Sequence, residues 1–154
     1  MSDARAKSVD PLVKNVVVPL AIPESFELFT SKMASWWPLA THSVAKERAA
    51  TCRLESGVGG RIYEVDDGGR EHLWGTVKVW EPPERVVFTW HPGREAGTAQ
   101  EVEVRFSSAP EGTAVELEHR NWETLRDEAE EIRSNYDAGW DITLRRMADA
   151  AGSH

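Results

Sequence analysis

Between residues 49 and 121 the chain mostly alternates hydrophobic and polar positions, the period of strands with one buried face. The segment EVEVRF (residues 101–106) is the clearest case. One face carries Val102, Val104 and Phe106, and charged residues occupy the other. Turns rich in Gly and Pro separate six such segments, which predict an antiparallel meander. The expected strands are 50–56, 61–65, 72–80, 85–90, 101–106 and 113–120.

The N-terminal part predicts one more strand followed by short helices. Residues 12–20, LVKNVVVPL, are rich in β-branched side chains and favour a strand at an edge of the sheet or ending near Pro19. Pro23 suits a first helical turn, and the helix must end before Pro38. We expect residues 1–10 to be frayed and residues 11–154 to form a single domain.

The C-terminal part predicts one long amphipathic helix over residues 124–151, with Thr124 as its N-cap and Asp127 as the acid of a capping-box-like start. Gly139 interrupts this helix, which indicates either a close approach to a strand or a bend. The simplest packing is an α+β fold, in which a curved seven-stranded antiparallel sheet wraps round the helix. The apolar stripe of the helix is Ala129, Ile132, Tyr136, Trp140, Leu144, Met147 and Ala151.

Several stretches resemble one known superfamily in the same order along nearly the whole chain. They are VVVPLAIPESFELFT, WWP, GVGGRIYE, WGTVKVWEPPERVVFTW, TAVELEHRNWE and GWDITLRRMADA. The sequence is similar to the START-like or SRPBCC superfamily with the helix-grip fold, and within it to the C-terminal domain of the activator of the heat-shock-protein 90 ATPase. The resemblance implies two short helices after the first strand, a cavity between sheet and helix, and a lid formed by residues 35–44.

Charge and cysteine content exclude several classes of function. The chain has 26 acidic and 18 basic residues, and its net charge of −8 disfavours nucleic acids and anionic membranes as partners. The single Cys52 excludes an intramolecular disulfide and fits a cytoplasmic protein. The five histidines show no metal-ligand spacing, so we expect neither a metal nor a cofactor. A solvated lattice of strand side chains is expected from Arg53, Glu55, Arg61, Tyr63 and Glu64.

Seven tryptophans stand against four phenylalanines, and an indole, with a large apolar area and one N–H donor, favours partly wet places such as pocket walls and interfaces. Trp36 and Trp37 are adjacent, and we predict that Trp37 plugs the core while Trp36 faces the cavity. Trp74 shares a strand face with His72 and Lys78, and a bulge near Gly75 is a feature that would re-aim its side chain. The predicted ligand-binding residues are Trp36, Trp74, Trp90, His119, Tyr136 and Trp140.

His119 falls on the apolar face of residues 113–120, and two interpretations stay open for it. It is either a hydrogen-bonded core histidine, with Trp122 packed at the junction between strand and helix, or a polar anchor in the cavity. His42 is expected to be a loop histidine. If the protein is an enzyme, His119 or His42 would be the general acid–base.

These observations favour the binding of a small apolar or aromatic molecule over catalysis, because no carboxylate partner for His119 is evident. The alternatives are a cofactor-free cyclase or aldol-type enzyme, or a chaperone-associated stress-response domain. No segment matches the separate domain with which the eukaryotic activator engages the chaperone, so a chaperone partner is not expected. A homodimer is compatible with the sequence.

Overall fold

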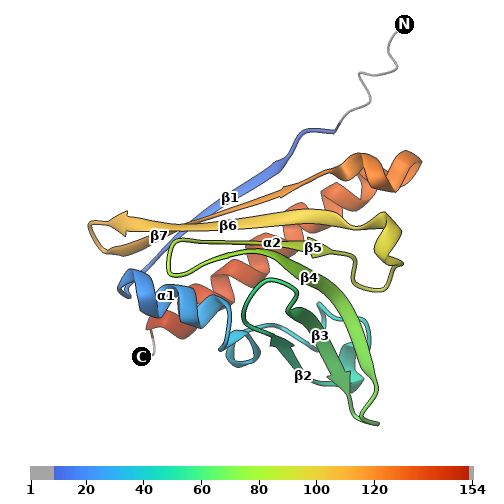
Figure 1. Cartoon of the computed structure of the whole chain (residues 1–154), viewed down its shortest axis with the longest axis horizontal. Coiled ribbons are helices and arrows are strands. Elements are labelled where there is room, and N and C mark those ends of the chain that lie inside the picture. Colours follow the sequence, from blue (N-terminus) through green and yellow to red (C-terminus); the bar gives the residue numbers. More distant parts are fainter. Residues whose placement is uncertain (1–8, 153–154) are drawn as a thin grey trace, which may run out of the picture.

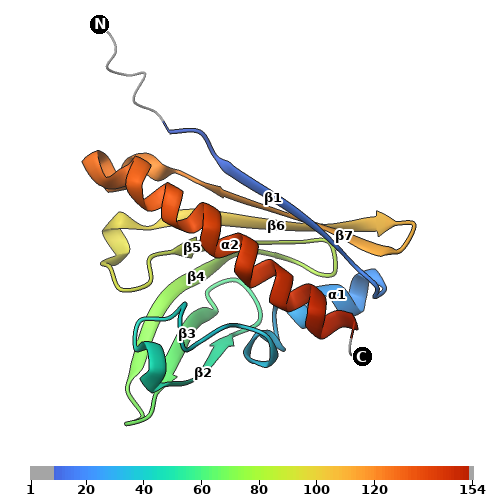
Figure 2. The same ribbon diagram turned by 180° about the vertical axis from the view of Figure 1, so that it is seen from behind.

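A curled antiparallel sheet of seven strands and one long helix, α2, make up most of the computed structural model, which describes residues 9–152 (Figure 1). The strand order is β1-β7-β6-β5-β4-β3-β2, so the N-terminal strand pairs with the last one. Figure 2 shows α2 running diagonally across the sheet. The strands are β1 (Leu12–Val18), β2 (Ala49–Leu54), β3 (Arg61–Asp66), β4 (Glu71–Glu81), β5 (Arg85–Trp90), β6 (Gln100–Ala109) and β7 (Gly112–Arg120).

The helices confirm the predicted helix-grip arrangement. The short helix α1 and the 3₁₀ turns η2 and η3 lie between β1 and β2, and the long α2 is the last described element. The expected fraying of residues 1–10 falls largely outside the described residues. The helices are α1 (Ile22–Phe29), η2 (Met33–Ser35), η3 (Lys46–Arg48), η4 (Ala96–Thr98), η5 (Trp122–Glu128) and α2 (Ala129–Gly152).

The long helix begins later than predicted. Residues 122–128 form the 3₁₀ segment η5, and Arg126 has φ 54° and ψ −122°, which breaks the helical path before Ala129. Thr124 is therefore not the N-cap of α2. Its hydroxyl instead donates to the carbonyl of Thr98 at 2.9 Å, so the side chain ties η5 to η4.

The core lies between α2 and the concave face of the sheet. Most of the predicted helical stripe is buried there, with Ile132 and Tyr136 only partly covered. The predicted bulge is confirmed: Ile62 pairs with Gly75 and Tyr63 with Leu73, which leaves Trp74 as the extra residue. A Cβ at Gly75 would lie 1.8 Å from the Thr89 carbonyl oxygen, so only glycine fits.

The outer face of β5, β6 and β7 carries a network of ion pairs around Glu103. This carboxylate accepts hydrogen bonds from Arg85 Nε at 2.6 Å and from Arg120 Nη1 at 2.7 Å, and Arg105 Nη1 lies 3.0 Å away. Burial alone would raise the pKa of Glu103, but the three guanidinium groups outweigh burial and lower the pKa to about 2. The carboxylate is therefore ionised in the folded protein at neutral pH.

We predict that Glu103→Gln lowers the free energy of unfolding at pH 7 by about 2 kcal/mol, because the arginines lose a charged acceptor. The pKa of Glu103 is lower in the folded protein than in the unfolded chain, so the ionised side chain stabilises the fold. This stabilisation is complete above the unfolded-state pKa and is lost as the pH falls toward about 2. Urea denaturation at pH 7 and at about pH 3 measures this change. Glu111→Gln, at an exposed position, serves as the control. If wild type and Glu103→Gln differed in unfolding free energy as much at about pH 3 as at pH 7, the prediction would be contradicted.

Candidate functional site

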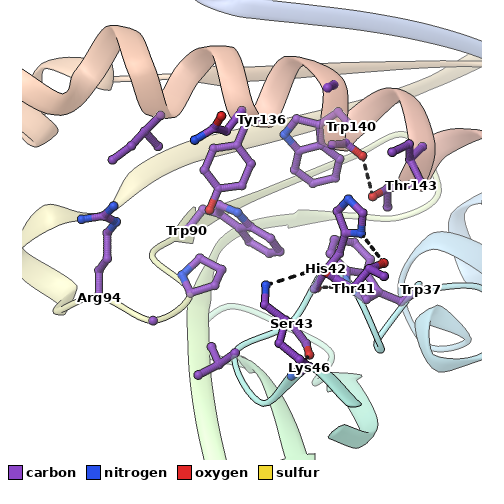
Figure 3. A pocket seen from close by; sticks show the side chains of 18 residues that line it. Trp37, Thr41, His42, Ser43, Lys46, Trp90, Arg94, Tyr136, Trp140 and Thr143 are labelled. Atoms are coloured by element: carbon purple, nitrogen blue, oxygen red, sulfur yellow. Dashed lines mark hydrogen bonds between the residues drawn. The ribbon is translucent and has the colours of Figure 1, made fainter. Parts of the chain in front are cut away.

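A pocket of about 550 Å³ lies between α2, residues 37–46 and the loop that follows β5 (Figure 3). This volume is within the range of small-molecule sites, about 300–1,000 Å³. The pocket has a buried floor and an exposed rim. The floor consists of Trp37, Ser43, Trp90, Trp140 and Thr143.

Three indole rings form most of the floor. The ring centroid of Trp37 lies 5.8 Å from that of Trp90 and 5.8 Å from that of Trp140, and the latter two are 5.7 Å apart. Each of these side chains is at most 6% exposed. Since aromatic rings at such distances pack favourably in tilted arrangements, the floor is a rigid apolar surface supplied by three separate elements.

The three indole N–H groups of the floor are used differently. Trp37 donates to the carbonyl of His42 at 2.7 Å, and Trp140 donates to His119 Nδ1 at 3.0 Å. Trp90 Nε1 is buried without a hydrogen-bond partner among residues 9–152. A buried donor without an acceptor costs about 1–3 kcal/mol, so Trp90 offers an unused hydrogen bond beside the pocket.

Tyr136 stands over the pocket with its hydroxyl directed inward (Figure 3). Burial raises its pKa, and the nearby Trp90 indole and Arg94 oppose this rise only in part. The Trp90 N–H and the phenol oxygen are thus neighbours, although they do not have hydrogen-bond geometry. The phenol keeps its proton at neutral pH and can donate to a bound molecule.

The adjacent tryptophans divide their roles in the opposite way to that predicted. Trp37 lines the pocket, whereas Trp36 lies behind it, packed on Phe29 with ring centroids 5.5 Å apart. Trp36 Nε1 donates to the carbonyl of Leu28 at 2.7 Å, and Arg146 on α2 donates to the Trp36 carbonyl at 3.0 Å. The prediction depended on where the helix before the pair ends: α1 ends at Phe29, and the separate 3₁₀ turn η2 (Met33–Ser35) directly precedes Trp36.

Glu64 connects the sheet to the segment that closes the pocket. Its carboxylate accepts hydrogen bonds from Val44 N at 2.6 Å, Ala45 N at 2.8 Å and Trp74 Nε1 at 2.6 Å, and the residue is fully buried. The expectation of Glu64 in a solvated lattice was therefore wrong. Alternation from the buried Ile62 puts it on the inner face of β3, and this signal could have identified it.

His42 is a loop histidine, as predicted, and it lies in the pocket wall. Its Nδ1 is 2.7 Å from Thr41 Oγ1, and its ring faces Gly139 on α2. Burial lowers its pKa, and the positive charge of Lys46 lowers it further. The imidazole is therefore neutral at pH 7 and able to accept a proton. Gly139 therefore faces the His42 ring. The expectation that Gly139 marks a close approach of α2 to a strand was wrong.

His119 is a core residue outside the pocket lining. Its Nδ1 accepts from Trp140, its Nε2 is 3.2 Å from Gln100 Oε1, and its ring stacks on Trp122 at 4.0 Å. Burial lowers its pKa to about 3, so it stays neutral. The structure thus corresponds to the first interpretation, a hydrogen-bonded core histidine. Both of its ring nitrogens are engaged, so neither is left for a ligand.

Half of the six predicted ligand-binding residues line the pocket. Those in the lining are Trp90, Tyr136 and Trp140, and those outside it are Trp36, Trp74 and His119. The rim residues were not predicted from the sequence, because they belong to loops or to the exposed side of α2 and follow no hydrophobic period. Among the described residues no group of acidic, His or Cys side chains is arranged to hold a metal ion. No helix within 9–152 is long and apolar enough to cross a membrane. The missed rim residues are Thr41, Lys46, Arg94, Asn135 and Ile142.

Comparison with known proteins supports the fold and adds one relative of stated activity. The family model described as activator of Hsp90 ATPase homolog 1-like protein matches residues 23–152. A solved structure of the anthrahydroquino-gamma-pyrone synthase Txn09, complexed with a molecule designated SUM, is 35% identical; the match covers 92% of this chain and 97% of that one, with a TM-score of 0.64. No curated protein matches the chain.

More distant solved structures share the fold alone. The Aha1 dimer from Colwellia psychrerythraea is 15% identical over 93% of this chain and 96% of its own, with a TM-score of 0.66. A protein of unknown function from Staphylococcus aureus is 14% identical over 96% and 97% of the two chains, with a TM-score of 0.65. The resemblance found in the sequence is therefore confirmed at the level of superfamily and fold.

We predict that Glu64→Gln destabilises the protein by about 1–3 kcal/mol, because an amide offers one acceptor oxygen and sets its NH₂ group against an N–H donor. Urea denaturation measures the loss, and hydrogen exchange at Val44 and Ala45 should become faster. Glu71→Gln, on the exposed part of β4, is the matched control. Unchanged exchange at residues 44 and 45 would show that Glu64 does not hold this segment.

Proposed function

The chain belongs to the family of activator of Hsp90 ATPase homolog 1-like proteins, and on that basis we propose that it binds a small aromatic molecule in the pocket beneath α2. The observation that carries this proposal is the floor of three indoles with one unused N–H donor. A flat aromatic ring can lie against these indoles, while an oxygen of the ligand accepts from Trp90 after a small movement of the Tyr136 side chain.

The expected affinity follows from the apolar area that the ligand buries. A two-ring aromatic compound burying about 200 Å² gains about 5 kcal/mol at about 25 cal/mol per Å². The cost of association reduces this gain, and hydrogen bonds from Trp90 and Tyr136 add to it. We therefore expect dissociation constants in the micromolar to millimolar range for simple aromatic probes.

A second candidate is cofactor-free proton transfer on a bound carbonyl compound. Two observations favour it: His42 is a neutral base in the pocket wall, and a relative with 35% identity is a synthase. His42 Nε2 would take a proton from the carbon next to the carbonyl, and the proton of Tyr136 would support the resulting enolate oxygen by a hydrogen bond. His119 has no part in this step, since both its ring nitrogens are bonded.

Cellular setting and assembly remain predictions. A cytoplasmic location fits the single Cys52, which is buried and whose pKa burial raises to about 12. The Colwellia relative is a dimer, and a homodimer of this chain is compatible with that likeness. A chaperone-associated role rests on the family name alone, so ligand binding is the stronger proposal.

We predict that Gly139→Leu prevents binding of two- and three-ring aromatic compounds, because its side chain would extend into the pocket beside His42. Quenching of tryptophan fluorescence and thermal shift measure binding. Gly139→Ala is the matched control: its Cβ would sit 3.5 Å from His42, an ordinary contact, and alanine favours the helix by about 1 kcal/mol. Equal responses from both variants and the wild type would contradict binding in this pocket.

For the second candidate we predict that the protein speeds the exchange of the carbon-bound protons of 2-tetralone for deuterium, followed by NMR in D₂O. His42→Gln should lower the rate by about 100-fold, and His72→Gln, outside this pocket, should leave it unchanged. Because the pKa of His42 is lowered, the rate should already be maximal at pH 7 and fall only in acid. Exchange no faster than in buffer alone would remove the catalytic candidate.

A further inference from the structure

The charge of the pocket differs from that of the rest of the molecule. Although 26 of the 154 residues are acidic, none of the 18 residues that line the pocket is Asp or Glu. The lining instead contains two cations, Lys46 and Arg94, together with His42. A pocket without carboxylates in an acidic protein points to a ligand that carries negative charge.

The two cations lie on different walls of the pocket. Lys46 begins η3, and Arg94 belongs to the loop after β5, so Figure 3 shows them on separate segments around the opening. Both residues are exposed, whereas Trp37, Trp90 and Trp140 are buried beneath them. The pocket is thus apolar and aromatic at its floor and cationic at its rim.

Both cations keep donors for a ligand. Lys46 Nζ donates to the carbonyl of Thr41 at 3.3 Å and forms no ion pair with a carboxylate among residues 9–152. Arg94 pairs with Glu128 at 3.2 Å, but Glu128 is exposed, and an exposed pair of this kind is worth at most about 1 kcal/mol. A guanidinium has five N–H donors, so this pair occupies only part of Arg94.

The backbone at Lys46 adds an independent observation. Its φ is 54°, in the left-handed region that glycine adopts without strain and other residues adopt at a cost. A lysine at this position is less stable than a glycine would be, but it places a cation at the rim. Glu64 holds the preceding residues, Val44 and Ala45, and so positions Lys46 relative to the floor.

We infer that the ligand is an anionic aromatic compound, a carboxylate or an acidic phenol on a fused ring system, with its ring on the tryptophan floor and its negative group between Lys46 and Arg94. This inference rests on the proposed function, because it concerns the same pocket. The neutral His42 adds no charge, so the two rim cations supply the attraction.

A pair of probes of nearly equal shape tests the inference: 2-naphthoate, which is anionic at pH 7, and 2-naphthamide, which is neutral. Titration followed by tryptophan fluorescence should give a dissociation constant about tenfold lower for 2-naphthoate. Raising the salt from about 20 mM to about 300 mM should weaken 2-naphthoate binding and leave 2-naphthamide binding unchanged.

Two variants test whether the rim cations cause the preference for 2-naphthoate over 2-naphthamide. Lys46→Gly removes a cation at a backbone position that suits glycine, so the fold should be retained, and Arg94→Gln removes the other. Each should reduce the preference for 2-naphthoate severalfold, and the double variant should abolish it. Lys32→Gln removes one positive charge outside the pocket lining and should leave the preference intact.

The outcomes separate this inference from the proposed function. Equal binding of 2-naphthoate and 2-naphthamide, or a preference that survives the double variant, would overturn the anionic assignment and leave aromatic binding standing. Binding of neither probe, or binding that Gly139→Leu does not affect, would overturn both.

Discussion

The pocket depends on one buried carboxylate, Glu64, which has no cation among its hydrogen-bond partners within residues 9–152. An ionised carboxylate is costly to bury unless donors satisfy its oxygens. Here the donors are two backbone N–H groups and one indole, so residues 44 and 45 must pass directly over β3 and Trp74 must turn inward. The bulge at Gly75 permits that turn. The segment that carries His42 and Lys46 is thereby attached to the sheet.

The two adjacent tryptophans serve different purposes, because their indole N–H groups are held by different carbonyls. Trp36 is fixed by the carbonyl of Leu28 and faces α1 and Phe29. Trp37 contacts the rings of Trp36, Trp74, Trp90 and Trp140, and its N–H bonds to the His42 carbonyl. Trp37 therefore joins the closing segment to the floor, and the pair forms one continuous aromatic layer from core to pocket.

Hydrophobic periodicity predicted the strands and the helical stripe, because burial of one face repeats along each of these elements. The bulge was expected at Gly75, where the alternation is broken. Periodicity identified Trp90, Tyr136 and Trp140 for the same reason as the strands. It failed for Thr41, His42, Lys46 and Arg94, which lie in segments without a period and come together only through the tertiary fold. The hydrogen bonds of His119 with Gln100 and Trp140 also could not be predicted from the sequence, since they join residues far apart in the chain.

Three local features that reduce stability gather around the pocket. Trp90 has a buried donor without a partner among residues 9–152, which costs about 1–3 kcal/mol. The left-handed backbone of Lys46 costs about 1–3 kcal/mol, and Gly139 weakens α2 by about 1 kcal/mol. Simple substitutions could relieve the last two without disturbing the core. The first two features instead provide what the proposed ligand site requires, namely a hydrogen-bond donor and a cation at the rim. The occurrence of Trp90 and Lys46 at one pocket, each at a cost in stability, supports the proposal that this pocket binds a ligand.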